Sequence, residues 1–163
     1  MTELAIEARL VAYTDPLVVP MLTELDHEYW TRYRHSLGDI AEEMTRGAAF
    51  GPPDGGVVLL LEDGGPVAGG AFRRHDERTA ELKRIWTHSA HRRRGLARRV
   101  LDELEREIRA RGYRRIYLTT GPRQPEAMAL YLATGYRPLY DPALDPEVIG
   151  PHPFEKVVGD GHP

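Results

Sequence analysis

Apolar residues recur along the chain with two different periods, and the helical period marks three segments. The first covers residues 17–25, where apolar side chains follow one another at helical spacing. The second runs from Gly95 to Gly112, and charged residues surround its single apolar stripe. The third, residues 124–135, has a proline in its first turn and a glycine after its end, as helices often do. The pattern therefore predicts three amphipathic or partly buried helices. The stripe of the second consists of Leu96, Val100, Leu101, Leu104 and Ile108.

The remaining apolar runs are short and lie between turn residues, which is typical of strands. The run VVLLL at 57–61 is followed by an Asp-Gly turn and a second apolar run, which predicts a hairpin. The segment 47–56 reads as a loop, the proline-rich segment 141–153 as a long connection, and 159–163 as a frayed tail. Further strands are predicted at 4–13, 80–88, 116–120, 136–140 and 154–158.

The order of these elements predicts the fold class. A strand and a helix precede an antiparallel meander, and a helix, a strand, a helix and a strand follow it. The strand-helix-strand unit at 80–120 is expected to be a right-handed crossover between two parallel strands. We therefore expect an α/β (α+β) fold with a mixed sheet and helices on both faces. A chain of 163 residues fits one domain, 1–163.

Composition excludes several functions. The chain is 41% hydrophobic and 29% charged, as expected for a soluble globular protein, and its net charge of −3 argues against a general nucleic-acid binder. It has no cysteine, so thiolate catalysis, disulfides and thiolate metal sites are excluded. The seven histidines lack metal-ligand spacing such as H-E-x-x-H, so we expect no metal.

The N-terminal sequence and the lengths of the apolar runs indicate the cellular compartment. The acidic start MTELAIEARL does not resemble a signal peptide, and the longest apolar run is far too short to span a bilayer. We expect a cytoplasmic protein without a membrane partner. The sequence leaves a monomer and a homodimer both open.

The stretch HRRRGLARR, residues 91–99, is called the arginine loop here and lies between a predicted strand and a predicted helix. A helix start presents unpaired N–H groups and a positive dipole end, so it attracts anions. Gly95 has no side chain and Ala97 a small one, so a phosphate can approach the backbone. This position favours a phosphate cradle. The alternatives are a solvated helix start and, less favoured because no wider basic face accompanies it, a nucleic-acid patch.

The pattern R-x-x-G-x-A at Arg92, Gly95 and Ala97 resembles the pyrophosphate-binding motif of the GNAT superfamily of N-acetyltransferases. The surrounding AELKRIWTHSAHRRRGLARRVL and QPEAMALYLATGYRP also resemble consecutive elements of that family. The resemblance covers residues 80–140 and 154–158. It implies a GNAT-like fold and transfer of an acetyl or short acyl group from acetyl-CoA to a primary amine of a small molecule or peptide.

The resemblance also implies which residues bind the co-substrate. The strand end at 85–87 would offer backbone groups to the pantetheine arm, the arginine loop would wrap the pyrophosphate, and Gln124 replaces an asparagine that contacts the cofactor in the family. The implied cofactor-binding residues are Ile85, Trp86, Thr87, Arg92, Arg93, Arg94, Gly95, Leu96, Ala97, Arg98 and Gln124.

Two residues are candidates for the chemistry. Tyr131 matches the family's proton-donor tyrosine, and a phenol of pKa about 10 is protonated at neutral pH. Its alternative is a core aromatic. Glu81 lies where several family members place the base, and its alternative is a strand carboxylate paired with Lys83 or Arg84. His88 is a further candidate base.

The acceptor pocket is predicted around residues 27–35, the acceptor stretch, which is rich in aromatic and ionisable side chains. For at least two of the aromatic side chains Tyr29, Trp30 and Tyr33, the alternative is that they pack in the protein and do not bind the acceptor. The chain has no cysteine and only Ser36 and Ser89 as serines, so a covalent acyl-enzyme is hard to build, and direct transfer in a ternary complex is expected. The competing functions are a non-catalytic acyl-CoA-binding module on the same fold and a nucleic-acid binder using Arg92–Arg99. The candidate pocket residues are His27, Glu28, Tyr29, Trp30, Tyr33 and Arg34.

Overall fold

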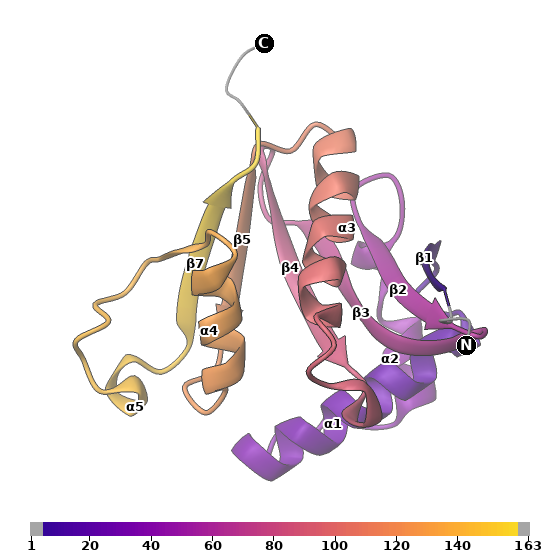
Figure 1. Ribbon diagram of the computed structural model, residues 1–163, viewed down its shortest axis with the longest axis horizontal. Helices are drawn as coiled ribbons and strands as arrows, with labels where there is room; N and C mark the ends of the chain where they lie inside the picture. The colour runs from indigo at the N-terminus through magenta and orange to yellow at the C-terminus, as the bar shows by residue number, and fades with distance from the viewer. Residues whose placement is uncertain (1–4, 160–163) are drawn as a thin grey trace.

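The computed structural model describes residues 5–159, and within them seven strands form one mixed sheet with helices on both faces (Figure 1). The strands are β1 (Ile6–Val11), β2 (Gly56–Glu62), β3 (Gly65–Arg74), β4 (Thr79–Thr87), β5 (Arg115–Thr120), β6 (Arg137–Pro138) and β7 (His152–Val157). The α-helices are α1 (Val19–Tyr33), α2 (Ile40–Thr45), α3 (Leu96–Ala110), α4 (Pro125–Ala133) and α5 (Pro146–Ile149). Short 3₁₀ turns are η1 (Pro16–Val18), η2 (Ala48–Phe50) and η3 (Ser89–His91).

The sheet has the strand order β1-β2-β3-β4-β5-β7-β6. Every neighbouring pair is antiparallel except β4 and β5, which are parallel and are connected through α3. The mixed sheet predicted from the sequence is thus confirmed. The parallel pairing runs only from Thr79↔Arg115 to Glu81↔Tyr117, after which the two strands separate, as Figure 1 shows.

Both faces of the sheet are covered, which explains the uninterrupted apolar run of β2. Successive side chains of a strand point to opposite faces. Val58 and Leu60 accordingly pack in the cluster under α3, whereas Val57, Leu59 and Leu61 pack in the cluster under α1. All five are at most 3% exposed. The apolar stripe predicted for α3 is likewise buried, and its C-terminal glycine, Gly112, has the left-handed φ of +87° expected there.

The structure departs from the predicted elements where local signals are weak. The strand predicted at 136–140 shrinks to two residues, and β7 begins at His152, inside the segment predicted as a connection. The helices α2 and α5 were not predicted because they span only six and four residues, too few for a helical period to show. The first strand is shorter than the predicted 4–13. Residue 4 of that predicted strand and residues 160–163 of the predicted tail lie outside the described range.

In the described part of the chain, no helix combines the length and apolar character needed to cross a bilayer. The same residues hold no group of three His, Asp or Glu side chains arranged to bind a metal ion.

A buried polar cluster ties α3 to the last strand and to the end of α4. Glu105 of α3, only 4% exposed, accepts hydrogen bonds from Tyr136 Oη (2.9 Å) and Lys156 Nζ (3.0 Å). Lys156 Nζ also donates to the Thr134 carbonyl, just after α4 (2.9 Å). Burial and the neighbouring Glu105 carboxylate raise the pKa of Tyr136, so its hydroxyl remains a donor. The cluster therefore fixes the helix that carries Tyr131.

The substitution Glu105→Ala is expected to destabilise the protein by about 3 kcal/mol, because it leaves the Lys156 ammonium and the Tyr136 hydroxyl without their acceptor. Urea unfolding measures the change. The matched control is Glu103→Ala on the same helix, which removes only a 3.5 Å ion pair with the exposed Arg106 and should cost less than about 1 kcal/mol. Equal losses in the two variants would contradict this role of the cluster.

Candidate functional site

A cavity of about 920 Å³ lies where β4 and β5 separate, within the roughly 300–1,000 Å³ typical of small-molecule sites. Residues 82–87 of β4 form one wall, and residues 118–121 at the end of β5 form the other. The C-terminal half of α1, the start of α3 and one face of α4 complete the lining. The cavity thus occupies a gap inside the sheet itself.

A bulge in β4 bends this strand next to the cavity. Gly69 of β3 pairs with Trp86 and Ala71 with Lys83, so one β3 residue lies opposite two β4 residues, Arg84 and Ile85. Arg84 has a left-handed φ of +60°, which is unusual for a residue with a side chain. Bulges increase local twist and bending. Among residues 5–159, β4 has no pairing partner on its β5 side beyond the bulge, so backbone N–H and C=O groups of residues 85–87 can bind a ligand there.

The arginine loop leads into α3 at one end of this cavity. Gly95 is the N-cap residue with a φ of +73°, and no side chain caps the helix. The first-turn N–H groups therefore have no side-chain acceptor. A Cβ added at Gly95 would meet no atom within 4 Å, so the space in front of the helix start is open. Arg92, Arg93 and Arg98 line the cavity around it, together with Leu96 and Ala97. This arrangement is a ready anion site.

The α1 residue Glu24 holds the start of the arginine loop in place. Its carboxylate accepts hydrogen bonds from Trp86 Nε1 (2.9 Å), from Ser89 N (2.9 Å) and from Ser89 Oγ (2.6 Å). Burial alone would raise the pKa of Glu24, but the hydrogen bonds from Ser89 and Trp86 outweigh it and lower the pKa. The ionised carboxylate thus connects the end of β4 to the residues that precede the helix.

Arg94 differs from its neighbours in the arginine loop. Its guanidinium forms a salt bridge with Glu62 at the end of β2 (Nη1 to Oε1, 3.1 Å), and Arg94 is not part of the cavity lining. Arg94 thus connects the arginine loop to β2, and the cofactor contact that the sequence resemblance implies for it stays a prediction. All other predicted cofactor-binding residues, from Ile85 to Gln124, line the cavity.

Tyr131 projects from α4 into the cavity lining and is 5% exposed. The Tyr131 hydroxyl forms no hydrogen bond with the described residues. Among these residues, His152 Nδ1 is the only side-chain polar atom that has no hydrogen-bond partner and is also inaccessible to solvent, so the Tyr131 hydroxyl must be accessible. The hydroxyl therefore opens onto the cavity. Burial raises the pKa of Tyr131 far above its ordinary value, so the phenol is protonated throughout the physiological range.

Gln124 connects α1 to the loop before α4 across the open end of the sheet. Its Oε1 accepts hydrogen bonds from Gly121 N (3.1 Å) and Tyr33 Oη (3.3 Å). Tyr33 Oη in turn accepts from Arg123 N (3.0 Å). Gln124 also lines the cavity. Its side-chain carbonyl oxygen therefore holds the loop before α4 against α1.

The two candidate bases, Glu81 and His88, lie outside the cavity lining, unlike Tyr131. Glu81 does not line the cavity, and its carboxylate pairs with Arg73 (3.0 Å) and Lys83 (3.8 Å). This geometry fits the alternative of an ion-paired strand carboxylate, and a base role for Glu81 stays a prediction. His88 uses Nδ1 to accept a hydrogen bond from Ala90 N (3.0 Å), and it also lies outside the lining.

The acceptor stretch divides into two groups. Glu28, Tyr29 and Tyr33 line the cavity, as does His35 after the helix. His27, Trp30 and Arg34 do not, and the Arg34 guanidinium lies over the half-exposed Trp30 ring at 5.5 Å. Sequence reasoning missed Leu37 and treated Arg84 only as an ion-pair partner, although both line the cavity. No local pattern marks Arg84, because the bulge that turns it arises from pairing with β3.

Comparisons with known proteins agree with this architecture. The model of the acetyltransferase (GNAT) family matches residues 20–136. The chain is 34% identical over 93 residues to the uncharacterized N-acetyltransferase YsnE of Bacillus subtilis, a match that covers 53% of this chain and 62% of that protein. It thus spans less than two thirds of that relative's length.

Solved structures show the same fold at low sequence identity. An acetyltransferase of the GNAT family from Staphylococcus aureus superposes with a TM-score of 0.75 at 16% identity, covering 95% of this chain and 100% of that chain. The PaiA N-acetyltransferase of Thermoplasma acidophilum, solved in complex with coenzyme A, superposes with a TM-score of 0.68 at 16% identity, covering 94% and 99%.

The substitution Gly95→Glu is expected to lower the affinity for CoA by at least roughly 100-fold, because a carboxylate would occupy the open space before the helix and repel phosphate. Isothermal titration calorimetry with CoA measures the affinity. Gly112→Glu is the matched control, since it adds the same charge at another open glycine of positive φ, outside the cavity. Undiminished binding by a folded Gly95→Glu protein would exclude the anion site.

Proposed function

The chain belongs to the acetyltransferase (GNAT) family, and we propose that it is an N-acetyltransferase that moves an acetyl group from acetyl-CoA directly to the primary amine of a small molecule or peptide. One observation carries the proposal. A single cavity holds both an anion-binding helix start ringed by arginines and a buried, protonated tyrosine. The first suits the phosphates of CoA, and the second suits a leaving group that needs a proton.

Binding of the donor would use both ends of the gap between β4 and β5. The N–H groups of the first turn of α3, with Arg92, Arg93 and Arg98 around them, are positioned for the pyrophosphate. The pantetheine arm carries amide groups, and the unpaired edge of β4 at residues 85–87 offers backbone partners for them. The acetyl thioester would then lie near the middle of the cavity.

Transfer requires the acceptor amine to lose its proton, since a lysine-like amine has a pKa of about 10.4. The carboxylates of Glu28 and Glu126 and the imidazole of His35 line the cavity and can accept that proton, directly or through water. A backbone N–H on the cavity side of residues 85–87 would stabilise the negative charge that develops on the thioester oxygen.

Departure of CoA would leave a thiolate that Tyr131 is placed to stabilise. Its hydroxyl opens onto the cavity, remains protonated and has no competing hydrogen bond to the described residues. The chain has no cysteine, and the Ser89 hydroxyl donates its hydrogen bond to the Glu24 carboxylate. Direct transfer from donor to acceptor therefore fits the residues better than a covalent acyl-enzyme.

The substitution Tyr131→Phe keeps the ring and removes the hydroxyl. We expect kcat to fall by roughly 10²–10⁴-fold, the usual scale for a general acid, with little change in acetyl-CoA affinity. Thiol release under saturating substrates measures kcat. Tyr113→Phe is the matched control, because it removes another buried tyrosine's hydroxyl, bonded to the Asp54 carbonyl and outside the cavity. Wild-type turnover in Tyr131→Phe would reduce Tyr131 to a packing residue.

The kinetic pattern provides an independent test of direct transfer. Initial rates measured over a grid of acetyl-CoA and amine concentrations should give intersecting double-reciprocal lines, because both substrates must be bound before the acetyl group moves. Parallel lines would indicate an acyl-enzyme and would contradict direct transfer.

A further inference from the structure

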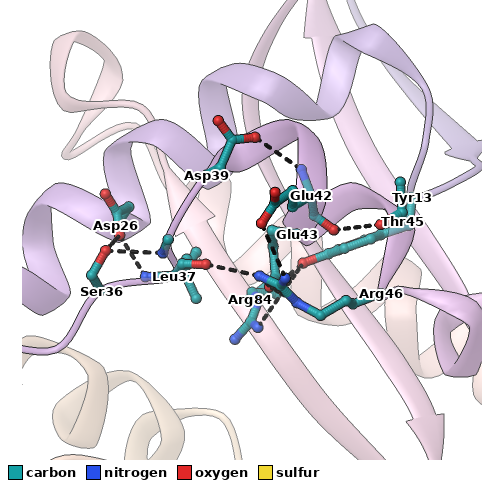
Figure 2. Close-up of polar contacts among 11 residues, drawn as sticks. Tyr13, Asp26, Ser36, Leu37, Asp39, Glu42, Glu43, Thr45, Arg46 and Arg84 are labelled. Carbon is teal, nitrogen blue, oxygen red and sulfur yellow. Dashed lines mark hydrogen bonds and ion pairs between the residues drawn. The ribbon is translucent and has the colours of Figure 1, made fainter.

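Arg84 lies in the cavity lining and also at the centre of a polar cluster behind it (Figure 2). Its Nε donates to Tyr13 Oη (3.2 Å) and its Nη2 to Glu43 Oε1 (3.0 Å). Arg46 donates to the other oxygen of the same Glu43 carboxylate (3.0 Å). Two guanidinium groups thus share the Glu43 carboxylate, and Arg46 also lies 4.0 Å from the carboxylate of the exposed Glu42.

The guanidinium of Arg84 has more donors than these contacts use. Its hydrogen bonds to Tyr13 and Glu43 use two of its five N–H groups, and a further interaction is made with the Tyr29 hydroxyl, which leaves donors available although the side chain is only 18% exposed. The Tyr29 hydroxyl lies beside it on the cavity lining. Burial raises the pKa of Tyr29 and the nearby Arg84 opposes this without overcoming it, so the hydroxyl remains a donor. Arg84 and Tyr29 together can hold a carboxylate.

The next residue of β4 adds to the same charge. Lys83 lines the cavity, and its partner Glu81 is also the partner of Arg73. Here again two cations share one carboxylate. The β4 side of the cavity therefore carries two cationic side chains, Lys83 and Arg84.

The opposite side of the cavity has the reverse arrangement. Glu28 of α1 and Glu126 of α4 both line the cavity, and both pair with Arg32. Arg32 pairs with both carboxylates, and Arg92 of the cavity lining also acts on Glu126. The cavity thus has cationic side chains on β4 and carboxylates on α1 and α4.

We infer that the acetyl acceptor is a zwitterion, an amine that also carries a carboxylate, with the carboxylate bound by Arg84 and the ammonium group drawn to the Glu28 side. The inference rests on the proposed function and narrows its substrate class to amino acids and related amino-carboxylates. A planar guanidinium is suited to a carboxylate because it can donate two parallel hydrogen bonds. A polyamine, by contrast, would leave the cationic side of the cavity without a counter-charge.

The experiment compares acceptors that differ only in the carboxylate. The twenty standard amino acids, their amides and their decarboxylated amines are assayed with acetyl-CoA by thiol release. We expect kcat/KM of the preferred amino acid to exceed that of its own amide and amine by roughly 10–100-fold, the scale of a hydrogen-bonded charge. In Arg84→Gln, the ratio of the acid to the amide should fall toward one.

Two further variants separate recognition from folding. Arg46→Gln removes the same charge and the same carboxylate partner but lies outside the cavity lining, so it should retain the preference for the acid. The double variant Arg84→Gln/Glu43→Gln removes the buried Glu43 carboxylate together with its Arg84 partner, so no buried charge loses its partner. This variant should lose the preference for the acid over the amide, while calorimetry should still detect CoA binding.

Equal kcat/KM for acids and amides in the wild-type protein would overturn the zwitterion inference and leave the proposed function standing. So would a preference for the acid that survives in both folded Arg84 variants. Absence of thiol release with every amine, although CoA binds, would overturn the proposed function and this inference with it.

Discussion

The early end of the parallel pairing between β4 and β5 is the constraint on which the site depends. The two strands share only the register from Thr79↔Arg115 to Glu81↔Tyr117, and the bulge at Arg84 then bends β4. A continued ladder would use up the backbone groups of residues 85–87 and fill the gap. Because pairing stops, one sheet supplies a cavity, an unpaired strand edge and a direct route from the arginine loop to Tyr131.

The bulge also explains how the acceptor side is built. A left-handed residue inside a strand costs on the order of 1–3 kcal/mol, and the surrounding contacts have to offset this. Arg84 gains hydrogen bonds to Tyr13 and Glu43 on the α1 and α2 face of the sheet. The strained residue is thus held by segments 71 and 41 positions away. The same contacts that stabilise the bulge aim the guanidinium at the cavity.

This dependence on distant contacts shows why the sequence indicated Glu28, Tyr29 and Tyr33 as cavity residues but did not indicate the position of Arg84. The α3 stripe, the arginine loop and the α4 helix are local patterns, so their positions follow from the sequence. The family resemblance then indicated which of their residues lie together, and all of these except Arg94, which pairs with Glu62 32 positions away, line the cavity. The proposed acceptor end is lined by α1 and the bulge of β4, and Glu43 of α2 holds Arg84 from behind. No periodicity in residues 80–88 distinguishes Arg84 from an exposed strand arginine, and the six residues of α2 are too few to show one.

The buried position of Tyr131 has two opposing effects on the proposed reaction. Burial raises its pKa, which keeps the phenol protonated but makes it a weaker acid than a thiol of pKa about 8.5 in water. A thiolate formed beside this buried hydroxyl would be partly desolvated too, so its pKa would rise in the same direction and the pKa difference between the phenol and the thiol would narrow. A hydrogen bond from the hydroxyl lowers the energy of the developing thiolate even before the proton moves. The proton that the amine loses, held on a carboxylate of the cavity lining, can then restore the phenol. The burial that makes Tyr131 a weak acid thus also strengthens its hydrogen bond to the leaving group.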